Sequence, residues 1–229
     1  VGQVAEPYRK ILHVIKKRLM HTQQWCQSQL RNEVSDLQPI SNIDELKQPL
    51  LMIHQSLLDT QLEVLANGAV LDLIRRIHCF GLNLSRLDIR QESERHAEVL
   101  SELCNYLNLG DYLGWSEIQK QQFLISELQS KRPLIPSQWK ASSTVQEVLD
   151  TCKVLASQAP GLVGPYIISM AHVPSDVLAV ALLLKEAGMA ELPPIVPLFE
   201  TLDDLNNSAD TLEQLLQIPW YKQQIQAYQ

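Results

Sequence analysis

Residues 164–171, with the sequence GPYIISMA, decide the fold class of this chain. They are mostly apolar and β-branched, and glycine and proline stand at their start, which predicts a strand buried on both faces. Residues 174–188 (PSDVLAVALLLKEAG) follow as a predicted helix that begins with proline and ends with glycine. Residues 195–199 (IVPLF) form another apolar run, so the sequence predicts strand, helix and strand in succession.

A third strand is predicted further upstream. Residues 83–90 (NLSRLDIR) alternate polar and apolar side chains, a period that is typical of a strand. Helical stretches separate the three strands, and such connections join parallel strands. Three parallel strands cannot close a barrel and leave open edges. We therefore expect partner strands beyond Gln229 and self-association of the isolated chain.

The rest of the chain is predicted to be largely helical. Apolar spacing and Pro7 predict a helix after Glu6, in a helical segment over residues 1–79 that precedes strand–helix units over residues 80–229. Thr201 and Asp204 have the spacing of a capping box, which predicts a helix start. The further helices are expected at residues 44–68, 69–78, 92–109, 116–129 and 144–159, and from residue 201 onward to Gln229.

The composition argues against several classes of protein. The chain has 229 residues and a formal net charge of −7, whereas a nucleic-acid surface needs a basic face. No apolar run approaches the roughly 18 residues of a membrane span. Four cysteines without a paired spacing predict reduced thiols in a cytoplasmic protein. The chain has neither an initiator methionine nor a signal peptide, so we expect it to be a piece of a longer protein.

In parallel α/β sheets, reacting side chains gather where the strands end. Arg90 ends its predicted strand, and its planar guanidinium group is suited to holding a phosphate or a carboxylate. The alternative is a structural salt bridge from Arg90 to Asp88, to Glu92 or to a neighbouring helix. The pattern alone leaves both roles open.

Glu200 follows the last apolar run, where a carboxylate is a suitable ligand for Mg²⁺ or Mn²⁺. One carboxylate is too few for a site, and a salt bridge from Glu200 to an arginine is the alternative. Asp203 and Asp204 are expected to stabilise the start of the next helix. Ser169 and His172 lie at the end of the second predicted strand. We expect structural roles for both, because such a serine usually bonds nearby backbone and the histidine has no partner that the sequence identifies.

Three longer motifs lie in this order along the chain: LDIRQES at residues 87–93, YIISM and PSDVLAV within residues 166–180, and VPLFETLDDL at residues 196–205. Together they closely resemble phosphoenolpyruvate carboxylases of the bacterial type. The resemblance covers most of the chain and is weakest before Leu65. It implies a single larger catalytic domain, a (β/α)8-type barrel wrapped by many helices. This chain, which is predicted to be mostly α with a few parallel strands (α/β), would contribute about three of the eight strands.

The resemblance also implies a Mg²⁺- or Mn²⁺-dependent lyase that joins phosphoenolpyruvate to bicarbonate and forms oxaloacetate and phosphate. By position, Arg90 is implied as the catalytic and substrate-binding residue that holds the phosphate, and Glu200 as one metal ligand. The second carboxylate ligand is expected beyond Gln229, so the isolated chain is expected to be inactive. The family further implies an allosterically regulated cytoplasmic homotetramer, and we expect no nucleic-acid or membrane partner.

Two alternatives remain open at this point. Another barrel enzyme that binds phosphoenolpyruvate, such as a kinase or a mutase, would account for Arg90 and Glu200 but not for the helical first third. A helical interaction module without chemistry would place Arg90 and Glu200 on unrelated surfaces.

Overall fold

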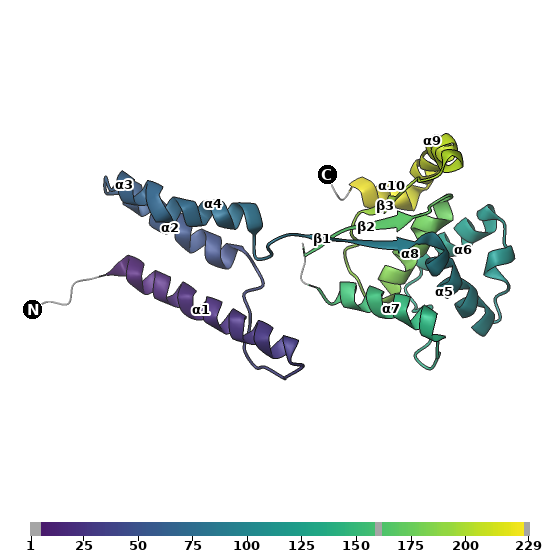
Figure 1. Ribbon diagram of the computed structural model, residues 1–229, viewed down its shortest axis with the longest axis horizontal. Helices are drawn as coiled ribbons and strands as arrows, with labels where there is room; N and C mark the ends of the chain where they lie inside the picture. Colours follow the sequence, from purple (N-terminus) through teal and green to yellow (C-terminus); the bar gives the residue numbers. More distant parts are fainter. Residues whose placement is uncertain (1–5, 159–161, 227–229) are drawn as a thin grey trace, which may run out of the picture. The chain divides into compact units, whose positions relative to one another are not determined.

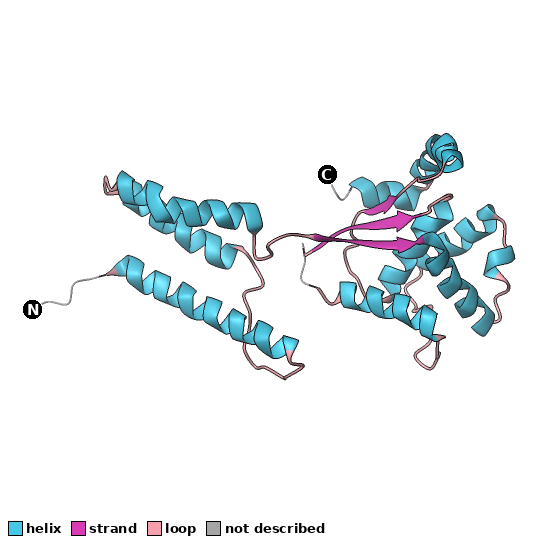
Figure 2. Cartoon of the chain, in the orientation of Figure 1, coloured by secondary structure: helices cyan, strands magenta, loops and turns pink. Residues whose placement is uncertain are grey.

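The structure of the chain is a computed structural model that describes residues 6–158 and 162–226. The chain forms two compact units, Val1–Ser85 and Arg86–Gln229. Figure 2 shows only helices and loops in the described part of the first unit, and helices around a sheet in the second. The predicted change from helical segment to strand–helix units falls after residue 79, whereas the boundary between the units follows Ser85.

The first unit packs helices around two small apolar clusters.

The prediction of one helix over residues 44–68 is wrong, because Gln61 takes a left-handed conformation (φ 62°) that does not continue a helix, and Gly68 departs from helical geometry as well. Pro7 occupies the first helical turn, as expected. The elements are α1 (Pro7–Leu30), α2 (Asp44–Asp59), α3 (Glu63–Leu65), the π-helical turn η1 (Ala66–Val70) and α4 (Leu71–Phe80).

The second unit is built on a parallel sheet of three strands in the order β1-β2-β3, which confirms the predicted parallel sheet. The strands are β1 (Leu87–Glu92), β2 (Val163–Ser169) and β3 (Ile195–Pro197). The predicted end of the first strand at Arg90 is wrong. Gln91 and Glu92 continue the pairing with Ile168 and Ser169, so the strand runs to the first residue of the next helix.

The strands β2 and β3 end earlier than predicted. Met170 has a φ of 51°, which turns the chain out of the extended conformation after Ser169. The contact between the two segments nevertheless continues, because the Leu198 N–H donates to the Ile168 carbonyl oxygen (2.8 Å). The residue that follows β3 therefore stays hydrogen-bonded to β2 just beyond the end of the strand.

Seven helical elements of the second unit are described, and most predicted boundaries hold within a few residues. Ser116 caps α6 and Thr201 caps α9 through capping boxes, and both starts were predicted. The helix predicted to end at Ala159 ends at Ala156, whereas the predicted end at Gln229 lies outside the described residues. The elements are α5 (Ser93–Tyr106), η2 (Tyr112–Gly114), α6 (Glu117–Gln129), α7 (Ser143–Ala156), α8 (Pro174–Glu186), α9 (Leu202–Gln217) and α10 (Pro219–Gln226).

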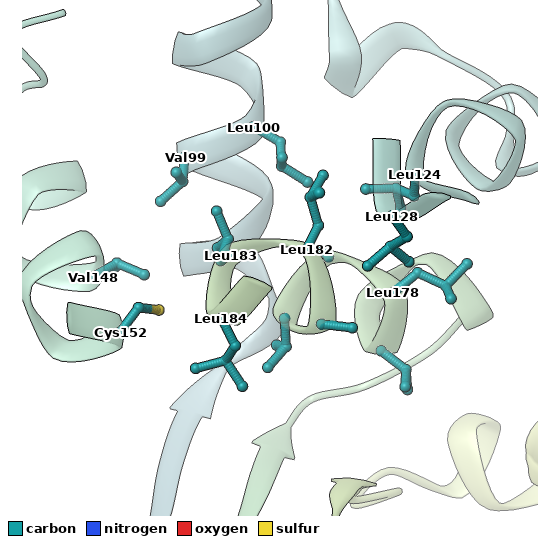
Figure 3. Packing of buried hydrophobic residues seen from close by; sticks show 14 of the residues in the cluster. Val99, Leu100, Leu124, Leu128, Val148, Cys152, Leu178, Leu182, Leu183 and Leu184 are labelled. Carbon is teal, nitrogen blue, oxygen red and sulfur yellow. The ribbon is translucent and has the colours of Figure 1, made fainter. Parts of the chain in front are cut away.

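The helix α8 forms the centre of the core of this unit. Every residue from Val177 to Leu184 is buried, so the helix is apolar on all sides. Figure 3 shows its leucines meeting Val99 and Leu100 of α5 and Leu124 of α6, with Cys152 of α7 close by. In Figure 1, α5, α6, α7 and α8 gather beside the same sheet.

Burial alternates along the strands and defines two unlike faces of the sheet. Gly164, Tyr166 and Ile168 of β2 are buried beneath the helices, whereas Ile167 between them is only half-buried. The prediction that this strand is buried on both faces is therefore wrong, because no described element covers its second face fully. We call this second face the open face; it comprises Asp88, Arg90, Glu92, Val163, Pro165, Ile167, Ser169 and Val196.

Candidate active-site face of the sheet

Arg90 lies on the open face, in one register row with Ile167 and Val196. Its side chain is 69% exposed, and both Nε and Nη2 donate to one carboxylate oxygen of Asp88 at 3.3 Å. Asp88 and Arg90 share this face because side chains two residues apart in a strand point the same way. The salt bridge that the sequence offered as an alternative is thus present.

This salt bridge leaves Arg90 available to a ligand. An exposed ion pair contributes only about 0–1 kcal/mol, and the guanidinium group has five N–H donors, of which Asp88 uses two. A dianionic phosphate that reaches the open face competes well with a single exposed carboxylate for the remaining donors. The geometry therefore allows both the structural and the ligand-binding role of Arg90.

Glu200 lies between the end of β3 and the start of α9, and its side chain is exposed. Within residues 6–158 and 162–226 it makes no hydrogen bond or ion pair, so the alternative of a salt bridge to an arginine is not found there. The next residue, Thr201, begins the capping box of α9: its Oγ1 accepts from the Asp204 N–H at 3.1 Å, and its N–H donates to Asp204 Oδ2 at 3.0 Å.

A divalent cation could use Glu200 as one ligand. Protein Mg²⁺ sites commonly combine one or two carboxylates with water and substrate phosphate oxygens, so an unpaired carboxylate at the ends of parallel strands suits this chemistry. In the described part of the chain, no three His, Cys, Asp or Glu side chains gather as a metal-binding group. The residues present fit one ligand of such a site.

His172 has a partner that no pattern in the sequence identifies. Its ring Nδ1 is hydrogen-bonded to Oδ1 of Asp204, which lies 32 residues further along the chain. Asp204 was expected to serve the start of α9, and it does so as well. Ser169, the other residue of this strand end, lies on the open face opposite Glu92.

Asp204 is a buried carboxylate that stays ionised. Hydrogen bonds from Thr201, and then the hydrogen bond and the charge of His172, lower its pKa to about 2, against a raising effect of burial. An ionised carboxylate only accepts hydrogen bonds, so the hydrogen in the contact with His172 is on the imidazole Nδ1. The imidazole is therefore held in one orientation at the carboxyl end of the sheet.

A second buried network lies on the helix-covered side of the strand that carries Arg90. The Tyr166 hydroxyl is 2.8 Å from His96 Nε2 and donates to Gln91 Oε1 at 3.1 Å. Because the tyrosine hydrogen is used toward Gln91, His96 Nε2 is the donor to Tyr166. His96 Nδ1 is then a bare acceptor, buried and without a hydrogen-bond partner among the described residues. Burial, and secondly the charge of Arg95, lower the pKa of His96 to about 4.

Comparisons with known proteins assign the chain to a family. The family model for phosphoenolpyruvate carboxylase matches residues 2–229. The chain is 52% identical over 225 residues to a phosphoenolpyruvate carboxylase of Hahella chejuensis, and 50% identical over 224 residues to one of Marinobacter nauticus. It is also 52% identical over 227 residues to the enzyme of that name from Escherichia coli. The chain therefore belongs to the phosphoenolpyruvate carboxylase family.

The chain spans about a quarter of the length of these curated relatives. The alignments cover 98%, 97% and 98% of this chain but only 26%, 25% and 26% of the Hahella, Marinobacter and Escherichia proteins. The expected match to a portion of a longer bacterial-type enzyme is confirmed. Among the described residues, no helix has the length and apolar character needed to cross a bilayer.

Proposed function

We propose that the whole protein to which this chain belongs carboxylates phosphoenolpyruvate with bicarbonate and releases oxaloacetate and phosphate. The family assignment supports the reaction, and one structural observation supports the site: Arg90 projects from the open face of a parallel sheet near the carboxyl ends of its strands. In this proposal the open face lines the inside of a (β/α)8-type barrel, whose other strands come from elsewhere in the protein.

The proposed chemistry needs a cationic group where phosphate is transferred. Bicarbonate oxygen attacks the phosphorus of phosphoenolpyruvate, the bond from phosphorus to the enol oxygen breaks, and carboxyphosphate and the pyruvate enolate form. The bond from the carboxyl carbon to the phosphoryl oxygen of carboxyphosphate then breaks, which gives carbon dioxide and phosphate. The enolate carbon attacks the carbon dioxide to give oxaloacetate. Arg90 holds the phosphoryl oxygens through its free N–H groups and offsets their charge during transfer. It is thus both a substrate-binding and a catalytic residue.

Glu200 is the ligand that this chain would contribute to a bound Mg²⁺ or Mn²⁺, and the ion would supply positive charge to offset negative charge on the substrate. We place the second carboxylate ligand beyond Gln229. The site is therefore incomplete in the isolated chain, which is expected to be inactive. By the family relationship we also propose a cytoplasmic homotetramer under allosteric control.

The test is oxaloacetate formation by the whole protein, measured with phosphoenolpyruvate, bicarbonate and Mg²⁺ and compared with the 229-residue chain. We expect bicarbonate-dependent activity in the whole protein, none in the short chain, and a loss of activity in the Glu200→Gln variant of the whole protein. Absence of oxaloacetate with the whole protein would refute the proposed reaction. Full activity in Glu200→Gln would refute the metal-binding role and leave the reaction in place.

A further inference from the structure

The loop between β2 and α8, residues 170–173, contacts the segment that carries Glu200 on both sides of that residue. Before Glu200, the Ala171 N–H donates to the Leu198 carbonyl oxygen at 3.4 Å. The Leu198 N–H in turn donates to the Ile168 carbonyl oxygen at 2.8 Å, so Leu198 is bonded in both directions. The chain is therefore fixed two residues ahead of Glu200.

The second contact follows Glu200 and runs through two side chains. His172 Nδ1 is hydrogen-bonded to Asp204 Oδ1, and Asp204 Oδ2 accepts from the Thr201 N–H at 3.0 Å. That N–H belongs to the peptide bond between Glu200 and Thr201, which is planar. The orientation of this peptide group therefore depends on the Asp204 carboxylate, and the carboxylate is held by His172.

His172 is itself fixed by the elements around it. Its backbone N–H donates to Asp176 Oδ2 at 2.9 Å, at the start of α8. Its carbonyl oxygen accepts from Thr211 Oγ1 at 3.1 Å, in the middle of α9. The imidazole therefore joins a rigid loop to the first turn of α9. Glu200, which makes no hydrogen bond or ion pair of its own in the described part of the chain, takes its position from these neighbours.

We propose that His172 is a positioning residue for Glu200, acting through Asp204 and the Glu200–Thr201 peptide group. The inference rests on the proposed function, because the position of Glu200 matters for the reaction only if its carboxylate binds the divalent cation. Partners that orient a metal ligand typically change metal affinity by 10–100-fold when they are removed. We therefore expect His172→Ala to weaken binding of Mn²⁺ to the whole protein by about tenfold.

The experiment measures two quantities that do not depend on turnover. One is the dissociation constant for Mn²⁺ alone, by electron paramagnetic resonance. The other is hydrogen exchange of the metal-free whole protein in peptides that cover residues 199–205. His172→Ala should weaken Mn²⁺ binding and speed exchange in this segment. The control is Ser208→Ala, which removes a hydrogen bond to the Leu205 carbonyl oxygen in α9 and should change neither quantity.

Two conservative variants separate positioning from a general loss of stability. The amide nitrogen of an asparagine side chain lies about where the histidine Nδ1 lies, so His172→Asn keeps a donor for Asp204 and should retain Mn²⁺ binding close to that of the natural protein. Glutamine places its amide at the position of Nε2, so His172→Gln should behave like His172→Ala. Equal effects of the two variants would overturn the proposal.

The variant Glu200→Gln distinguishes a failure of this inference from a failure of the proposed function. If Glu200→Gln leaves the Mn²⁺ dissociation constant unchanged, the metal-binding role of Glu200 is refuted, and the inference fails with it. If Glu200→Gln weakens Mn²⁺ binding while His172→Ala changes neither Mn²⁺ binding nor exchange, the role of Glu200 stands and the positioning role of His172 is refuted.

Discussion

Replacing His96 by glutamine should remove a large part of the acid sensitivity of the second unit. His96 is fully buried, donates from Nε2 to Tyr166, and has no partner for Nδ1 in the part of the chain that the structure describes. A second proton on Nδ1 would therefore place a charge in an apolar site with no acceptor to receive it. For this reason the pKa falls from 6.5 to about 4, with burial as the main cause and the charge of Arg95 as the second.

The size of the effect follows from the two protonation equilibria. The unfolded chain binds a proton at His96 near its usual pKa of 6.5, whereas the folded protein binds it only near 4. Above about pH 6.5, His96 is neutral in both states and does not lower the free energy of unfolding. As the pH falls from 6.5 toward 4, the unfolded chain binds a proton that the folded protein does not, so the free energy of unfolding decreases. At about 1.4 kcal/mol per pKa unit, the loss is about 2 kcal/mol between roughly pH 7.5 and pH 5, and about 3 kcal/mol at pH 4.

The assay is urea unfolding of the 229-residue chain followed by tryptophan fluorescence at several pH values. His96→Gln keeps a donor for Tyr166 but does not titrate, so its free energy of unfolding should fall less between about pH 7.5 and pH 5 than that of the natural chain. The difference between the two slopes isolates His96, because the other titrating groups are common to both proteins. His78→Gln, which replaces an exposed histidine, is the control for the substitution itself. Parallel pH profiles for the natural chain and His96→Gln would refute the reasoning.

Three further predictions follow from the packing. Gly164→Ala should lower the free energy of unfolding by about 1–3 kcal/mol, because its Cβ would lie 3.2 Å from a carbonyl oxygen of β1; an unchanged urea midpoint would contradict this close approach. Burial raises the pKa of Cys104 to about 11 and that of Cys152 to about 12. Thiol reagents at about pH 8 should therefore modify only the exposed Cys26 and Cys79 rapidly. Rapid modification of all four cysteines would contradict the structure. The open face and the exposed edges of β1 and β3 should make the 229-residue chain self-associate, and sedimentation of a monomer at high concentration would count against this.

Local sequence patterns predicted the parts of the fold that local physics determines. The three parallel strands, the helix start at Ser116, the capping box at Thr201 and the apolar helix α8 all follow from patterns a few residues long. The end of β1 did not follow in this way. Gln91 and Glu92 are polar and suit a helix start, but they pair with β2, and this pairing partner lies over 70 residues away in the sequence.

The contacts that fix the site could not be predicted, because they join residues distant in sequence. His172 and Asp204 are 32 residues apart, and neither has a short-range pattern that selects the other. The same holds for charged side chains that bond the ends of other helices. Lys185 donates to carbonyl oxygens at the end of α6, and Glu117 accepts from the first turn of α8. The sequence supplied Arg90 and Glu200 as candidates, whereas their surroundings required the structure.

The central claim is that the open face of this sheet binds phosphoenolpyruvate through Arg90. The most direct test compares kcat/KM for phosphoenolpyruvate in whole-protein variants Arg90→Ala and Arg86→Ala. Arg86 is also exposed but precedes β1, so it serves as a matched control for the loss of one positive charge. We expect Arg90→Ala to lose about a hundredfold or more in kcat/KM and Arg86→Ala to stay near the natural value. Equal effects of the two substitutions would contradict the account.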